Sequence, residues 1–246
     1  MQVSIIMPYF NKKKFIKASI DSVLMQSFQN FEIIIIYDDI NLDDYKFIKN
    51  FEKLDNRIKV IKNMHNLGPG LSRNKGIEVS TGKYIAFLDC DDIWEKDKLK
   101  YQIDFMLQNK YILTFSSYNI INSKDQLIGS RKAKKTISYN DLIWSCDIGL
   151  STVILKKDVF NDYCRFPDLK TKEDYVLWLK LTQKNQNFFG LDRPLTKWRK
   201  LDKSQSSNLL QKMKDGFKVY NNYLKFNKVR SLYHLFFLSL NFLKKN

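Results

Sequence analysis

Strand-like and helix-like segments alternate over the first 108 or so residues of the 246-residue chain, and this alternation restricts the fold more than any other feature. The strand-like segments are residues 3–7, 31–37, 57–61 and 84–88. Helical spacing of apolar residues follows each of them, at 14–25, 42–54, 70–79 and 96–107. Strands joined by helices form a parallel sheet with helices on both faces. We therefore predict an α/β fold with a doubly wound, mostly parallel sheet flanked by helices.

The rest of the chain has a less regular pattern. Residues 112–116 and 151–155 are strand-like, and residues 171–183 have the spacing of a helix. From Asn208 onward, apolar residues recur every three or four positions, which predicts a helical C-terminal tail. We expect one domain over residues 1–205, with halves at 1–110 and 111–205, and a basic amphipathic tail over 206–246.

Positive charge is concentrated in this tail. The chain has a formal net charge of +16, and residues 203–246 hold nine Lys or Arg against one acid, Asp215. Basic amphipathic segments bind anionic membrane surfaces or nucleic acid, but helices that pack on their own domain give the same pattern. No helix-turn-helix, zinc-finger or RNA-recognition signature is present, so we expect no nucleic-acid partner. Membrane contact and packing on the domain both stay open.

The two ends of the chain favour a cytoplasmic location. The sequence begins Met-Gln-Val-Ser-Ile-Ile, without the basic region that precedes the apolar part of a signal peptide. The longest apolar stretch near the end, residues 232–243, is about half the length of a bilayer span. We expect a cytoplasmic protein that can bind peripherally to the cytoplasmic face of the membrane.

Aspartates follow two of the predicted strands. Asp38 and Asp39 end the second strand, and Asp89, Asp91 and Asp92 end the fourth. The carboxyl ends of parallel strands meet at one edge of the sheet, where ligands bind, so the two clusters should converge. Clustered carboxylates need a cation or hydrogen bonds, and hard oxygen ligands without histidine favour Mg²⁺ or Mn²⁺. The alternative is that they are solvated loop residues or helix caps.

A third acidic pair, Glu173 and Asp174, opens the predicted helix at 171–183. Acids are common at helix N-termini because they interact favourably with the helix dipole. A general base on a rigid helix end is the functional alternative. The glycines at 68, 70 and 76 form neither GxGxxG nor a phosphate-binding P-loop motif, so a dinucleotide fold and a P-loop protein are disfavoured.

Taken together, six motifs resemble the family 2 glycosyltransferases, enzymes with a GT-A fold that build bacterial cell-surface glycans. The motifs are residues 3–11, 22–28, 31–39, 72–76, 82–92 and 173–178. Each motif alone is weak, but all six in this order are specific, and they extend over nearly the whole chain. The resemblance implies a Rossmann-like GT-A sheet, with a nucleotide-binding half at 1–110 and an acceptor half at 111–205.

The resemblance also implies roles in the nucleotide site. Pro8 and Phe10 would line the nucleoside pocket, and Asp39, with Asp38 beside it, would contact the base. Arg73 would belong to the same site. The Gly-Ser that commonly follows the two aspartates is missing here, which puts the geometry of that loop in question.

The remaining roles concern the metal, the diphosphate and the reaction. Asp89 and Asp91 match the DxD motif: Asp91 would ligate a Mn²⁺ or Mg²⁺ ion that bridges the diphosphate, and Asp89 would hold the ribose or the metal shell. Asp174 matches the catalytic base, with Glu173 beside it. No histidine follows Arg199, so Arg199 and Lys200 could instead face the diphosphate. This list of roles is implied by the resemblance alone.

The function implied is inverting, metal-dependent transfer of a sugar from a nucleotide-diphospho-sugar, with UDP preferred, to a hydroxyl of a glycan or lipid-linked acceptor. Polysaccharide or lipopolysaccharide synthesis would be the setting. A catalytically degenerate nucleotide-sugar-binding protein is one alternative. A phosphatase with Asp89 as nucleophile is another, but such enzymes expect Thr or Val two places after the second aspartate, where this chain has Ile93.

Overall fold

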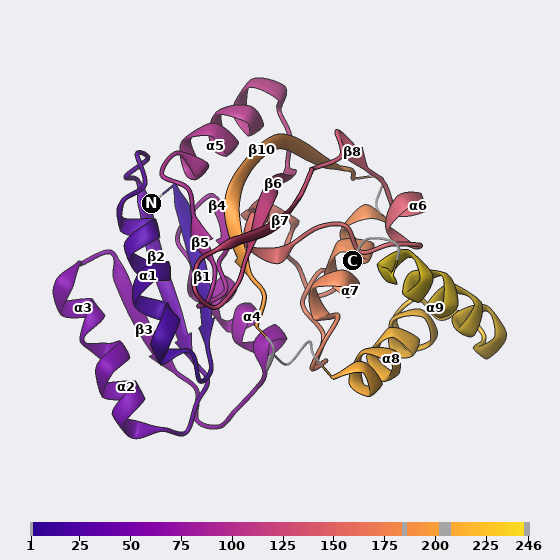
Figure 1. Ribbon diagram of the computed structural model, residues 1–246, viewed down its shortest axis with the longest axis horizontal. Helices are drawn as coiled ribbons and strands as arrows, with labels where there is room; N and C mark the ends of the chain where they lie inside the picture. The colour runs from indigo at the N-terminus through magenta and orange to yellow at the C-terminus, as the bar shows by residue number, and fades with distance from the viewer. Residues whose placement is uncertain (1, 184–185, 202–207, 244–246) are drawn as a thin grey trace.

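The computed structural model describes residues 2–183, 186–201 and 208–243. Within these residues, one ten-stranded mixed sheet forms the centre of the molecule (Figure 1). The main strand order is β3 (Ile58–Lys62), β2 (Phe31–Tyr37), β1 (Val3–Tyr9), β4 (Tyr84–Phe87), β9 (Ile154–Lys156), β6 (Leu113–Ile121), β10 (Phe188–Arg199) and β5 (Ile93–Trp94). Two further strands lie off this order: β7 (Leu127–Arg131) pairs with β6, and β8 (Thr136–Ile137) pairs with β10.

The first half of the chain forms the parallel part of the sheet, as predicted. β1 pairs in parallel with both β2 and β4, and β2 pairs in parallel with β3. The register places Tyr9 opposite Tyr37 and Ile6 opposite Phe87, so the three carboxyl ends lie at the same edge. The connecting helices are α1 (Lys13–Leu24), α2 (Leu42–Lys49), α3 (Phe51–Leu54), α4 (Pro69–Val79) and α5 (Lys98–Asn109). The single helix predicted over 42–54 is thus two helices.

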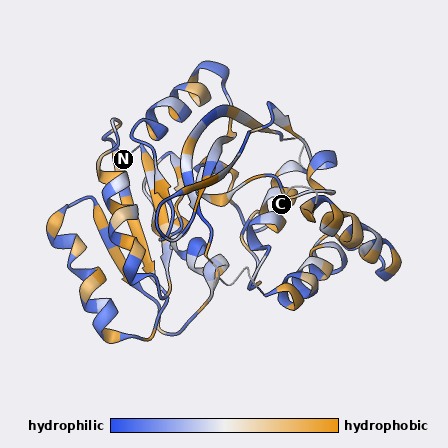
Figure 2. Ribbon diagram, viewed as in Figure 1, coloured by the Kyte–Doolittle hydropathy of each residue, from blue (hydrophilic) through white to orange (hydrophobic). Residues whose placement is uncertain are grey.

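Helices cover both faces of the sheet. Odd-numbered residues of β1 pack with α1, α2, α3 and α5 in one apolar cluster. Ile6 of β1 packs with α4 and α7 (Glu173–Thr182) in the other. Because successive side chains of a strand point to opposite faces, a continuous apolar strand is needed for two such clusters. Figure 2 shows the central strands largely in orange, the colour of hydrophobic residues.

The second half of the chain departs from the predicted elements. The strand predicted over 151–155 is a 3₁₀ turn, Leu150–Thr152, followed by β9, which runs antiparallel to β4 and β6. The twelve-residue strand β10 was not predicted, although it pairs in parallel with β6 along most of its length. Its middle, Asp192-Arg193-Pro194, is exposed and lies at a break in the register. A proline within a strand-like segment argues against a strand, so the presence of Pro194 explains why β10 was not predicted.

The tail is helical, as predicted, and it packs on the domain. It consists of α8 (Leu209–Lys218), a π-helical turn (Val219–Tyr223) and α9 (Lys228–Leu243). Val219, Tyr220, Leu235 and Leu238 join the apolar cluster that contains α7. The predicted domain boundary after residue 205 lies outside the described residues. No helix in the described part of the chain is long and apolar enough to cross a bilayer.

Candidate functional site

The acidic loops after β2 and β4 both contact the loop after β1. The Oδ2 atom of Asp39 accepts a 2.9 Å hydrogen bond from the backbone N–H of Asn11. The neighbouring residue, Lys12, places its Nζ 2.6 Å from Oδ2 of Asp91. The two aspartate clusters therefore converge at one edge of the sheet, as the parallel register predicts.

The two aspartates after β2 have different surroundings. The Asp38 side chain is buried and accepts hydrogen bonds from the backbone N–H groups of Leu67 and Gly68 and from Nδ2 of Asn63, all within 2.8 Å. Its carboxylate thus shapes the turn that leads into α4. Asp39 is partly exposed, so it is the member of the pair that a bound base can reach. The sequence did not separate these roles.

The residues predicted to line the nucleoside pocket lie at the end of β1. Pro8 pairs with Ile36 of β2 and accepts a hydrogen bond at its carbonyl from the thiol of Cys90. Phe10 follows the strand with 44% of its surface exposed, next to the Asp39–Asn11 contact. An exposed aromatic ring beside an accessible carboxylate can stack on a base and bind its polar edge. The nucleoside contacts of both residues stay predictions.

The DxD pair supplies the oxygen ligands that Mg²⁺ and Mn²⁺ prefer. The side chains of Asp89 and Asp91 are 35% and 15% exposed, and both follow β4. Among the described residues, no group of three or more acids, histidines or cysteines could hold a metal ion. Two carboxylates nevertheless fit a site whose shell substrate phosphates complete. The Lys12 ammonium provides positive charge at Asp91.

The DxD loop is held from behind by a third aspartate and by β10. Buried Asp92 accepts hydrogen bonds from Oγ of Ser151 and from the backbone N–H of Arg199. The Arg199 guanidinium donates to the carbonyl of Asp91 and forms a 2.6 Å ion pair with Asp125. Sequence reasoning missed this clamp because it depends on β10. Arg199 thus contacts Asp91, Asp92 and Asp125. The diphosphate contact predicted for Arg199 and for the exposed Lys200 stays a prediction.

Arg73 joins the DxD motif to the acidic pair on α7. Its side chain is 4% exposed, with Nη2 2.7 Å from Asp89 and Nη1 2.7 Å from Glu173. Both carboxylates raise the already high pKa of the Arg73 guanidinium, so it stays charged despite burial. Arg73, which was predicted to belong to the nucleotide site, therefore forms an ion-pair bridge between Asp89 and Glu173. These two residues lie 84 positions apart in the sequence.

The arginine bridge distinguishes the two acids at the start of α7. Glu173 is buried and is held by Arg73, and burial raises its pKa to about 7. Asp174 is partly exposed, and its Oδ1 accepts from the backbone N–H of Tyr175 at 2.7 Å. The pKa of Asp174 is also raised by burial. Among the described residues its other oxygen has no hydrogen-bond partner, and the role of general base predicted for Asp174 stays a prediction.

Close helix packing sets the position of α7. A Cβ on Gly70 of α4 would lie 2.6 Å from the carbonyl of Pro167 and 3.3 Å from Cβ of Glu173. A larger residue at position 70 would therefore push the start of α7 away from α4. The residue before the helix, Lys172, has a left-handed conformation with φ 67°. Strained backbone of this kind is often found at functional sites.

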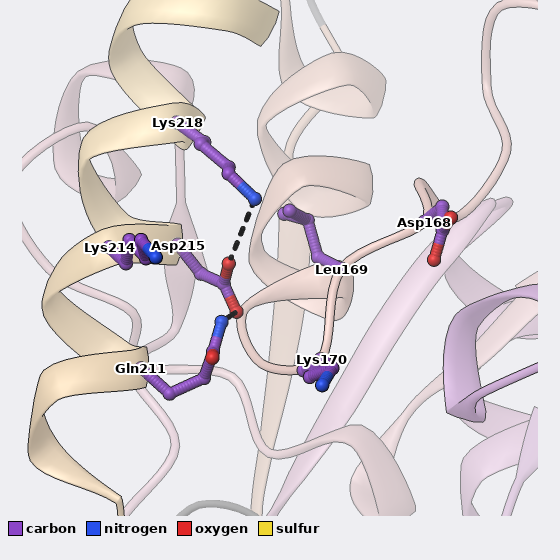
Figure 3. A pocket seen from close by; sticks show the side chains of 7 residues that line it. All are labelled: Asp168, Leu169, Lys170, Gln211, Lys214, Asp215 and Lys218. Carbon is purple, nitrogen blue, oxygen red and sulfur yellow. Dashed lines mark hydrogen bonds and ion pairs between the residues drawn. The ribbon is translucent and has the colours of Figure 1, made fainter.

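The tail helix α8 holds the same segment from the other side. Oδ2 of buried Asp215 accepts hydrogen bonds from the backbone N–H and the hydroxyl of Thr171, each at 3.0 Å, and from Gln211 at 2.9 Å. Figure 3 shows Asp215 between Gln211 and Lys218 on α8. These residues and residues 168–170 line a cavity of about 300 Å³. The only acid in the basic tail thus fixes α8 against the chain three residues before Asp174.

The fold and this arrangement define an α/β protein with an acidic site at the carboxyl edge of its parallel strands, and comparison with known proteins identifies its family. The model of "Glycosyl transferase family 2" matches residues 4–163. The chain is 37% identical over 234 residues to the UDP-Glc:alpha-D-GlcNAc-diphosphoundecaprenol beta-1,3-glucosyltransferase WfgD of Escherichia coli, with 95% of this chain and 90% of that protein covered. The chain belongs to glycosyl transferase family 2 and is a glycosyltransferase.

Two further likenesses agree with this. The chain is 33% identical to the putative teichuronic acid biosynthesis glycosyltransferase TuaG of Bacillus subtilis, over 89% of this chain and 86% of that protein. A crystal structure of S. aureus TarS residues 1–349 in complex with UDP-GlcNAc superposes with a TM-score of 0.74 at 21% identity, and covers 96% of this chain and 70% of that one. The GT-A fold inferred from the six motifs is confirmed.

Proposed function

We propose that this glycosyltransferase transfers a sugar from a UDP-sugar, with inversion, to a hydroxyl of a lipid-linked diphospho-sugar during cell-surface polysaccharide synthesis. The observation that carries the proposal is the Arg73 bridge, because it holds the DxD aspartate and the acidic end of α7 in one site. A donor diphosphate at Asp89 and Asp91 would then present its sugar toward Asp174. The name of WfgD supports this acceptor class, and the name of TuaG supports a role in polysaccharide synthesis. The name of WfgD and the UDP-GlcNAc complex of TarS support a UDP-sugar donor.

In the proposed mechanism, the carboxylate of Asp174 accepts the proton of the acceptor hydroxyl. At the same time, the oxygen of that hydroxyl attacks the anomeric carbon of the donor sugar. The new C–O bond forms as the bond to the nucleoside diphosphate breaks, and a single displacement inverts the anomeric centre. Asp91 and Asp89 would hold a Mn²⁺ or Mg²⁺ ion, which when bound offsets negative charge on the departing diphosphate. Lys12 adds positive charge at the same place. The Arg73 bridge keeps Glu173 and Asp89 in position around the reacting groups.

A transfer assay tests this proposal. We expect the protein with Mn²⁺ and a GlcNAc-diphospho-lipid to consume one UDP-sugar and to extend the lipid. NMR of the product should show the anomeric configuration opposite to that of the donor. Retention of configuration, or transfer only from donors without UDP, would contradict the proposal. Binding of a donor without any transfer to this acceptor or to glycan acceptors would favour the catalytically degenerate alternative.

The same assay has an expected pH dependence. Burial raises the pKa of Asp174, and burial raises that of Glu173 to about 7. A base must be deprotonated to act, so kcat/KM should rise with pH through the raised pKa of Asp174, at a higher pH than for an ordinary aspartate. Glu173→Gln should keep this rise, since Asp174 remains. A rate without such a rise would show that no carboxyl with a raised pKa takes the proton.

A further inference from the structure

The helix α9 has one face that packs on the domain and another, apolar face that is exposed. Its inner face consists of Ser231, His234, Leu235 and Leu238, all buried against the domain. Its outer face repeats at intervals of three and four, and its side chains are 55–79% exposed: Val229, Leu232, Tyr233, Phe236 and Leu243. Large apolar side chains that are exposed together on one helix face are normally covered by a partner or a membrane. The outer face of α9 is therefore an interaction surface.

The adjacent helix α8 also exposes apolar side chains. Its buried residues are Asp215 and Gly216, and Gly216 lies against Leu235 of α9. Leu209, Leu210 and Met213 occupy other positions on this helix and are 69%, 83% and 40% exposed. We call these three residues and the five of α9 the apolar stripe of the tail. In Figure 1 the two helices lie at the end of the molecule opposite α2 and α3.

Basic and aromatic residues accompany the apolar stripe. Lys214, Lys228 and Arg230 are exposed on the two helices, while the only acid of the tail, Asp215, is buried. Trp144 of the domain packs against Tyr233 of the stripe, with ring centroids 6.0 Å apart, and is 36% exposed. Apolar side chains with cations beside them bind anionic bilayers, and Trp and Tyr favour the headgroup level. A second copy would bring two basic tails together, which charge repulsion opposes.

We propose that the apolar stripe of the tail inserts shallowly into an anionic membrane surface, with its flanking lysines on the headgroups. Asp215 and Thr171 connect α8 to the start of α7, so a bilayer bound there would lie at a fixed position relative to Asp174. The surface residues carry this proposal. Only the benefit of membrane binding rests on the proposed function: it would place the site beside a lipid-linked acceptor.

Co-sedimentation with vesicles tests the proposal. We expect the full chain at about 0.1 M salt to bind vesicles of phosphatidylcholine with phosphatidylglycerol far more than vesicles of phosphatidylcholine alone. The double variant Leu232→Ser/Phe236→Ser should bind at least about tenfold more weakly, because two apolar side chains are no longer buried in lipid. Lys214→Gln/Lys228→Gln should weaken binding to the anionic vesicles selectively. Both variants change exposed side chains, so their circular dichroism and melting should match the wild type.

Leu54→Ser on α3 is the matched control, because Leu54 is 75% exposed and belongs to a helix at the other end of the molecule. It should bind vesicles like the wild type. Wild type that stays in the supernatant with anionic vesicles would overturn the proposal. The proposal would also be overturned if the protein self-associated in ultracentrifugation without lipid and Leu232→Ser/Phe236→Ser abolished this self-association. The apolar stripe would then contact a second copy of the chain. Transfer to a detergent-dispersed acceptor is expected to be unchanged in the double variant, so the outcome is independent of whether the transferase mechanism is correct.

Discussion

Replacing Asp174 with Asn is expected to lower kcat by about 10²–10⁴-fold while donor binding is unchanged. The structure supports this expectation by the contrast with Glu173. Glu173 is held by Arg73 at 2.7 Å, whereas Asp174 uses one oxygen for the N–H of Tyr175, and its other oxygen has no partner among the described residues. Asn keeps the shape and the hydrogen-bonding oxygen but cannot accept a proton from a hydroxyl. Single-turnover transfer measures the effect, and calorimetry with UDP checks binding.

The matched control is Glu173→Gln, which changes the neighbouring acid by the same chemistry. Its main effect should fall on the Arg73 ion pair and hence on stability, with a smaller loss of kcat than Asp174→Asn. The reverse order, with Glu173→Gln as the more damaging change in kcat, would assign the proton transfer to Glu173. Asp174→Asn that retains wild-type kcat would exclude Asp174 as the base.

Arg73→Met is expected to lower the free energy of unfolding by about 3–5 kcal/mol, because it leaves the buried Glu173 carboxylate without its cation and also removes the partner of the partly exposed Asp89. The Arg73 side chain is 4% exposed, and it contacts both Asp89 and Glu173 at 2.7 Å. Urea unfolding near pH 7.5 measures the loss. If the variant folds too poorly, Arg73→Lys, which keeps the charge but not the paired geometry, should lie between it and the wild type.

The pH dependence of this loss has a definite sign. Burial already raises the pKa of Glu173 to about 7, and Arg73 acts in the opposite direction. Without Arg73 that pKa rises further, so the variant gains stability by protonating Glu173 as the pH falls from about 7.5 to about 5.5. The deficit should therefore shrink at low pH, and Arg73→Met/Glu173→Gln should be less affected than the sum of the single variants. An equal loss at both pH values, with additive variants, would mean that the Arg73–Glu173 pair contributes little.

Much of the fold could be predicted because the relevant signals are local. The strand Phe31–Tyr37 has the continuous apolar pattern of a central strand, and α7 has buried residues on nearly every side. The strand predicted over 151–155 overlaps β9, but its antiparallel pairing could not be predicted, since it depends on partners far along the chain. The strand β10 was missed because Pro194 interrupts its pattern. The stripes of the tail predicted helices, but only the structure separates the face that packs from the face that is exposed.

The site shows the same division. The aspartates and the acidic pair on α7 were found from their position after strands and at a helix start. The contacts of these residues could not be predicted. The sequence does not show that Arg73 bridges Asp89 and Glu173, or that Asp38 accepts hydrogen bonds from backbone N–H groups. The Arg199 clamp on the DxD loop was missed for the same reason as β10, from which it comes.

The measurement that tests the central claim most directly is calorimetric titration with UDP, GDP, dTDP and CMP, with and without Mn²⁺. The account predicts that one nucleoside diphosphate, UDP, binds in a Mn²⁺-dependent manner. It also predicts that Asp91→Ala loses this binding, whereas Leu54→Ser on the far surface keeps it. Folded wild-type protein that binds none of the nucleotides, or an Asp91→Ala variant that binds UDP with unchanged affinity and Mn²⁺ dependence, would contradict a donor site at this edge of the sheet.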